Sequence, residues 1–133
     1  MKKFTFAFAL ALFANNALAD WVLIDSSNIG NLYFNNAKIK SKDGVVRAWT
    51  LMNFSNTQFT ENKAAYSSRV AIAEYDCSNS LTNLLSLNSY TERMGAGGVV
   101  EVYENRERDW MKISPNTLIE KAFETICRNH QSN

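Results

Sequence analysis

Histidine and cysteine, the residues that most often carry enzyme chemistry, are scarce in this sequence of 133 residues. The only histidine, His130, lies three residues from the C-terminus. A serine-type hydrolase needs a nucleophile, a histidine base and an orienting acid held rigidly together. A histidine at a fraying terminus does not meet that need, and a single one cannot build a histidine-based zinc site. We therefore predict a protein that is not an enzyme and has no catalytic residues, metal or cofactor.

The two cysteines, Cys77 and Cys127, are fifty residues apart. An even cysteine count in an exported chain favours a structural disulfide, because oxidising compartments pair such thiols. Closing a loop of this length removes about 4 kcal/mol of entropy from the unfolded state. Two free thiols or a redox pair are the alternatives, although a redox motif needs cysteines that are close in sequence.

The glycine-rich segment 94–98, Met-Gly-Ala-Gly-Gly, could in principle cradle a phosphate with its backbone amides. Both common phosphate-binding loops require a strand before the glycines and a helix after them. Here the Val-Val-Glu-Val run at 99–102 follows, which is typical of a strand. We interpret the segment as a connection between strands whose glycines adopt positive φ.

One cluster of mixed charge, Glu-Asn-Arg-Glu-Arg-Asp-Trp at 104–110, stands out near the end of the chain. It fits a solvated hairpin loop, but arginine and tryptophan are also enriched among residues that dominate binding energy. We predict a partner-binding surface made of Arg93, Arg106, Arg108 and Trp110.

The N-terminus has the organisation of a secretory signal peptide. Two lysines precede an apolar stretch at 4–13, and Ala17 and Ala19 place small residues where signal peptidase binds. A membrane anchor is the alternative, but about ten helical residues span only ~15 Å of a hydrocarbon core ~30 Å thick. We expect cleavage of residues 1–19 after Ala19, which leaves residues 20–133 as one soluble domain without a transmembrane segment.

The charge of the expected mature chain is close to zero. The whole sequence has 14 basic and 13 acidic residues, and two of the basic residues lie in the signal peptide. The remaining 12 basic and 13 acidic residues give a net charge of −1 with histidine neutral. A global affinity for nucleic acid is therefore not expected.

The elements that must position these residues are short runs separated by turn signals. Asp43-Gly44 is a tight hairpin signal, and turn-forming residues also cluster at 26–30, 55–62, 76–80 and 95–98. The runs between them predict strands at 21–25, 32–40, 45–54, 66–76 and 99–104. The strand at 66–76 is apolar on both faces, so both should be covered, whereas 99–104 has the charged ends of a strand near a sheet edge. The segment 81–90 fits a helix or a strand equally well.

A C-terminal helix is predicted from Pro115 to about Arg128. Ser114 is a good N-cap, and proline is favoured at the first helical position. One apolar stripe runs along this helix, formed by Leu118, Ile119, Ala122, Phe123 and Ile126. A bridge from Cys127 to Cys77 would pin the helix to the sheet at the end of the 66–76 strand.

Taken in order, these residues resemble the surface-adhesin protein E family of Gram-negative bacteria. The matching pattern consists of Trp21, Val46-Arg47-Ala48-Trp49, Tyr66-Ser67-Ser68, Asp76-Cys77, Tyr90, Gly95, Gly97, the run from Trp110 to Pro115, and Cys127. The resemblance implies an α+β fold, with a curved antiparallel sheet like half of a barrel and a C-terminal helix packed on it. It also implies one disulfide, Cys77–Cys127, and favours a strand at 81–90.

The functional implication of the resemblance is attachment to host extracellular-matrix proteins by an exported protein, with homodimerisation plausible. A surface lipoprotein would need a cysteine after the cleavage site, where Asp20 stands, so no lipid anchor is expected. The alternative is therefore a soluble periplasmic accessory or structural protein of the cell envelope. The expected location is the periplasm, the cell surface or the medium, and the expected partner is a protein or glycan outside the cytoplasm.

Overall fold

The structure is a computed structural model that describes residues 20–130. Its elements in chain order are β1 (Trp21–Ser27), β2 (Gly30–Lys42), β3 (Val45–Phe59), β4 (Ala65–Asp76), β5 (Leu81–Tyr90), the 3-10 helix η1 (Arg93–Gly95), β6 (Val99–Glu104), β7 (Met111–Lys112) and α1 (Leu118–His130). The expected signal peptide at 1–19, with Ala17 and Ala19, lies outside the described residues.

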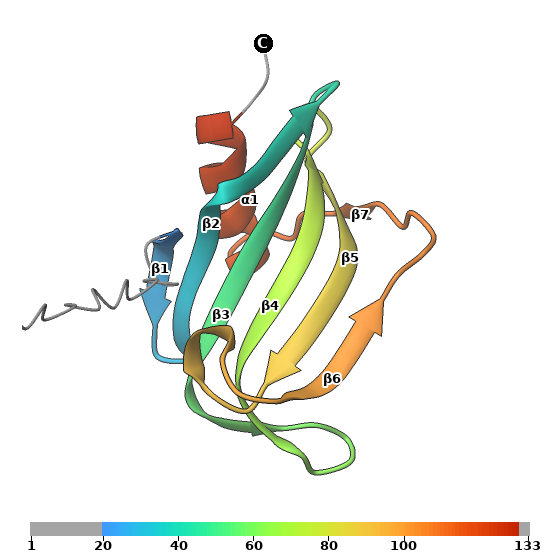
Figure 1. The fold of residues 1–133 in the computed structure, drawn as a ribbon. Helices are drawn as coiled ribbons and strands as arrows, with labels where there is room; N and C mark the ends of the chain where they lie inside the picture. Colours follow the sequence, from blue (N-terminus) through green and yellow to red (C-terminus); the bar gives the residue numbers. More distant parts are fainter. Residues whose placement is uncertain (1–19, 131–133) are drawn as a thin grey trace, which may run out of the picture.

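The strands form one antiparallel sheet in which β1 to β6 follow one another in sequence order (Figure 1). The order ends at β1 on one side and at β6 on the other, so the sheet is curved but open. Helix α1 packs behind the sheet near β2. The predicted α+β fold, a half-barrel sheet with one C-terminal helix, is confirmed.

The hairpin between β2 and β3 turns on Asp43 and Gly44, as the sequence predicts. Their φ values are 53° and 79°, which is the positive region that a two-residue hairpin turn requires at both positions. Lys42 pairs directly with Val45 across the turn. This turn fixes the register of two of the longest strands.

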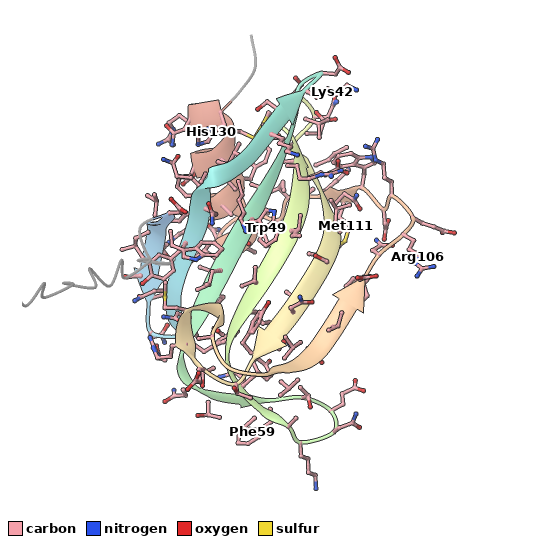
Figure 2. All side chains as sticks on the ribbon, in the orientation of Figure 1. Lys42, Trp49, Phe59, Arg106, Met111 and His130 are labelled. Carbon is pink, nitrogen blue, oxygen red and sulfur yellow. A yellow bond between two sulfur atoms is a disulfide. The ribbon has the colours of Figure 1, made fainter. Side chains whose placement is uncertain are left out.

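The turn expected at 55–62 is wrong for residues 55–59, because β3 continues to Phe59, and right for residues 60–62. A register shift between Asn53 and Gln58 lets β3 and β4 remain paired beyond the polar residues, and Phe59 pairs with Ala65. Side chains on a hairpin that projects into solvent need not be apolar, so the polar run hides the strand from pattern analysis. Figure 2 shows Phe59 near the far end of this hairpin.

The ambiguous segment at 81–90 is strand β5, as the family resemblance favours. It pairs with β4 from Leu81 to Tyr90. Its other edge carries two separate strands, β6 opposite residues 86–90 and β7 opposite residues 81–82. The hairpin loop expected for the charged segment 104–110 is therefore wrong. Most of this segment forms a loop between β6 and β7, which pair with different parts of the same strand, β5.

Helix α1 begins at Leu118, three residues later than predicted. Asn116 has φ 59°, so Pro115 and Asn116 form a turn and do not begin the helix. Thr117 is the observed N-cap, because its Oγ1 accepts the Glu120 backbone N–H at 3.2 Å. The Glu120 carboxylate in turn accepts the Asn116 N–H at 3.1 Å. Thr-Leu-Ile-Glu is thus a variant of the capping box, which the prediction overlooked in favour of Ser114.

The core lies between α1 and one face of the sheet. It is built from Leu32, Phe34, Val46, Ala48, Ala73, Tyr75, Ala122, Ile126 and Cys127. The predicted disulfide Cys77–Cys127 is present, with Cα atoms 5.6 Å apart, and joins the helix to the end of β4. Ile119, expected in the apolar stripe, is instead 53% exposed.

The other face of the sheet, which we call the open face, is covered only in part. Segment η1 lies over one end, where Gly95 is close to Val70 and Leu51. The expectation that 66–76 is covered on both faces therefore holds at that end. Towards the other end, alternation along β3 and β4 turns Arg47, Trp49, Ile72 and Glu74 away from α1.

Candidate binding surface

The loop between β6 and β7, residues 105–110, contains most of the predicted contact residues; we call it the edge loop. It replaces edge-strand pairing opposite residues 83–85 of β5. Two backbone amides fix its ends, since Asn105 N–H donates to the Leu85 carbonyl at 2.8 Å and Asp109 N–H donates to Asn83 Oδ1 at 3.0 Å. The edge loop is thus anchored at both ends while its middle projects into solvent (Figure 2).

Next to the edge loop, the buried carboxylate of Glu74 accepts hydrogen bonds from three side chains. The Glu74 side chain is 5% exposed, and its Oε2 atom receives Arg47 Nη2 at 3.3 Å and Arg108 Nη2 at 3.4 Å. Its Oε1 atom accepts Asn83 Nδ2 at 3.2 Å. A buried carboxylate requires such compensation, because desolvation of an unpaired charge is costly. Glu74 therefore links β3, β5 and the edge loop at one point.

The predicted residues of the edge loop differ in exposure. Arg106 and Arg108 are exposed and Trp110 is half-buried. The Arg108 guanidinium lies 5.8 Å from the centroid of the Trp110 ring, within cation–π range. Beside the loop, Val102, Tyr103 and Met111 are exposed by 62%, 47% and 60%. Exposed apolar side chains next to arginine and tryptophan have the composition of a protein-binding surface.

The fourth predicted contact residue, Arg93, lies apart from the edge loop. Its Nη1 donates to the Phe54 carbonyl of β3 at 2.8 Å. Phe54 is seven residues along β3 from Arg47, a separation of about 23 Å at ~3.3 Å per residue. The structure thus brings Arg106, Arg108 and Trp110 together and places Arg93 near the opposite end of the sheet.

Two adjoining hollows on the open face form a groove that pattern analysis missed. The larger has a volume of about 870 Å³ and the smaller about 380 Å³, and both are lined by Lys40 and Arg47. We define the basic groove by the five cations that line these hollows, which are Lys38, Lys40, Lys42, Arg47 and Arg108. Among the described residues that line these hollows, only Asp43 and the buried Glu74 supply negative charge.

The sequence carried one signal for this groove. Lys38, Lys40 and Lys42 recur with period two, so a strand places them on one face. The partnership of Arg47 with Glu74 had no comparable signal, because it depends on the register between β3 and β4.

Within residues 20–130, no group of three or more histidine, cysteine, aspartate or glutamate side chains is placed to hold a metal ion. His130 packs its ring against Phe34, with centroids 5.8 Å apart. No helix in the described part of the chain is long and apolar enough to cross a bilayer.

Comparisons with known proteins identify the family of the chain and agree with its fold. The family model described as surface-adhesin protein E matches residues 21–128. Two structures of Haemophilus influenzae protein E are 18% identical to the chain, with TM-scores of 0.60 and 0.62, and cover 84% of it and 86% and 90% of their own chains. A structure of protein E from non-typeable Haemophilus influenzae is 17% identical with a TM-score of 0.58, over 84% of this chain and 78% of its own. No curated protein sequence matches significantly. Since the family model spans almost all of the described residues, the chain belongs to the surface-adhesin protein E family.

Proposed function

We propose that this protein is exported, loses residues 1–19, and attaches the cell to host extracellular-matrix proteins through the edge loop. The observation that carries the proposal is membership of the adhesin family over residues 21–128, which favours an extracellular binding role over catalysis. The edge loop supports it, because exposed arginine, tryptophan and apolar side chains meet there.

Arg93 belongs to the proposed contact set as an outlying member. A protein–protein interface of standard size buries about 800 Å² on each partner. A patch of that area is roughly 30 Å across, so one partner can span the distance between Arg93 and Arg108. The proposal therefore predicts a smaller effect for Arg93→Ala than for substitutions in the edge loop.

The test is binding of the purified protein to a panel of immobilised host extracellular-matrix proteins. We expect saturable binding to at least one of them, weakened about tenfold or more by Arg106→Ala with Arg108→Ala. The matched control replaces two exposed cations elsewhere, Lys63→Ala with Arg128→Ala, and should leave affinity within about twofold.

Because Arg108 contacts the buried Glu74, the single variant Arg106→Ala is measured alongside the double variant. Arg106 makes no ion pair among the described residues, so its loss should not disturb folding. Binding that is equal for wild type, the edge-loop variants and the control would remove the edge loop from the proposal. Absence of binding to all matrix proteins would contradict attachment and favour the envelope-accessory role.

A further inference from the structure

The basic groove concentrates positive charge in a chain whose overall charge is close to zero. Five cations line it against two carboxylates. Among residues 20–130, no ion pair joins Lys38, Lys40 or Lys42 to a carboxylate. All three lysines are exposed, and they lie along one strand at intervals of roughly 7 Å. The groove thus presents a linear row of uncompensated charges.

The floor of the groove holds its two guanidinium groups in place. Arg47 and Arg108 both direct one Nη2 atom at the same oxygen of Glu74. A guanidinium has five N–H donors, so most of the donors of each arginine remain for another acceptor. Because Glu74 is buried and also bonded to Asn83, it is a rigid anchor for the two arginines.

The shape of the groove selects among anionic ligands. Its two hollows share Lys40 and Arg47, so the positive surface is elongated and exceeds what a single small anion would fill. Strands β3 and β4 are paired on both edges at the floor, so an extended acidic peptide could join the sheet only at the outer edge of β2 beyond Asn35, where β1 no longer pairs. The Trp49 ring is covered by Lys38 Nζ at 4.0 Å, so it is not a free platform for stacking a nucleic-acid base.

We infer that the basic groove binds a sulfated polysaccharide chain of the host matrix. Lysine ammonium groups act as point charges that accept sulfate groups without strict geometric matching, and the anchored arginines add directional donors. Sulfated glycosaminoglycans carry more charge per unit length than carboxylate-only glycans, which suits five cations in a continuous groove. The inference shares with the proposed function the exported location, the host matrix and one residue, Arg108; the class of ligand and the rest of the surface are different.

The experiment measures binding of the purified protein to a size-defined heparin oligosaccharide by calorimetry over a series of salt concentrations. We expect Lys38→Gln/Lys40→Gln/Lys42→Gln to weaken binding about tenfold or more and to reduce the salt dependence of affinity. The matched control, Lys63→Gln/Lys112→Gln/Arg128→Gln, removes the same charge from exposed positions outside the groove and should change affinity by less than about threefold. Circular dichroism and urea unfolding establish that both variants are folded.

Three results would overturn the inference. They are the absence of heparin binding, equal weakening by the groove and control variants, and equally tight binding of hyaluronan or of an acidic peptide matched in charge. Binding to matrix proteins from which the glycans have been removed distinguishes failure of the groove inference from failure of the proposed function. If those proteins still bind through the edge loop while heparin does not bind, only the groove inference fails; if heparin binds and the proteins do not, only the proposed function fails.

Discussion

Glu74 is the side chain through which the edge loop and the basic groove are connected. A buried ion pair contributes little net stability, whereas removing one partner leaves a costly uncompensated charge. The arrangement of Arg47, Arg108 and Asn83 around Glu74 is therefore best understood as positioning. It holds the base of the edge loop against the sheet and directs two guanidinium groups into the groove.

At the residue scale, Gly30 makes a sharp stability prediction. Its φ is 147°, and a Cβ atom there would overlap the backbone carbonyl oxygen of Asn53 in β3. We expect Gly30→Ala to lower the free energy of unfolding by about 2–4 kcal/mol, measured by urea titration. Gly98→Ala is the control, because Gly98 lacks a positive φ and the nearest atom, Thr91 Cγ2, is 4.0 Å from the added Cβ. Similar losses of unfolding free energy in both variants would show that the close approach of Gly30 to β3 does not determine the cost of the substitution.

Tyr75 predicts a dependence of stability on alkaline pH. Burial raises the pKa of its phenol above the ordinary value of 10.0. From about pH 10 upward the unfolded chain releases this proton while the folded protein keeps it, so the free energy of unfolding falls as pH rises. Below that pH the contribution is fully present. We expect Tyr75→Phe, which has no ionisable group at this position, to flatten the fall in urea midpoint above about pH 10.

The control for this measurement is Tyr103→Phe, which removes an exposed phenol from β6. Tyr103→Phe should retain the alkaline loss of stability seen in the wild type. If wild type and Tyr75→Phe have the same pH dependence, the buried phenol does not contribute to alkaline unfolding.

At the scale of elements, the edge of the sheet beyond β5 determines where the candidate surface lies. Strands β6 and β7 pair with different parts of β5, and the edge loop fills the interval between them. The buried amide of Asn83 replaces the missing strand partner by bonding both the edge loop and Glu74. Interrupted edge strands also limit unwanted sheet-to-sheet pairing, which exposed edges otherwise favour.

The N-cap of helix α1 leads to a prediction about stability. Thr117→Ala removes the hydroxyl that accepts the Glu120 N–H, and we expect a loss of about 1 kcal/mol in the free energy of unfolding. Ser114→Ala, at the N-cap expected from the sequence, should cost less than about 0.5 kcal/mol, because the observed bond at Ser114 uses its carbonyl oxygen. A larger loss for Ser114→Ala than for Thr117→Ala in chemical denaturation would contradict the observed cap.

Local signals in the sequence were sufficient where structure depends on neighbours in the chain. The Asp43-Gly44 turn, the apolar helix face around Ala122 and Ile126, and most strands follow from turn chemistry and periodicity. The continuation of β3 to Phe59 and the pairing of both β6 and β7 with β5 depend on partners distant in sequence. Period-two patterning does not encode such register.

The candidate surface also contains one part that local sequence predicts and one part that depends on the fold. Arg106, Arg108 and Trp110 are recognisable because they are adjacent in the chain. The basic groove needed the fold, since Arg47 of β3 and Arg108 of the edge loop meet only through Glu74 of β4. The period-two row at Lys38, Lys40 and Lys42 could have indicated part of it. To infer a groove from this row of lysines, one must also know which face of the sheet α1 leaves uncovered.

At the scale of the whole molecule, the protein combines a family fold with two adjoining surfaces for which we propose binding roles. The disulfide Cys77–Cys127 closes a long loop and fixes α1 against one face, which leaves the open face and the edge loop for contact with partners. The net charge near zero hides this asymmetry, because the cations of the groove are offset by acidic residues elsewhere. Long-range attraction of anions is therefore expected to be weak, with binding concentrated in the groove.

The most direct test of the account is protease accessibility of the full-length protein in intact bacterial cells. If the protein acts in attachment at the cell surface, external protease should degrade it in intact cells as completely as after permeabilisation of the outer membrane, while a periplasmic marker stays protected. If the protein is protected until the outer membrane is opened, it works in the periplasm, and the proposed attachment role is contradicted.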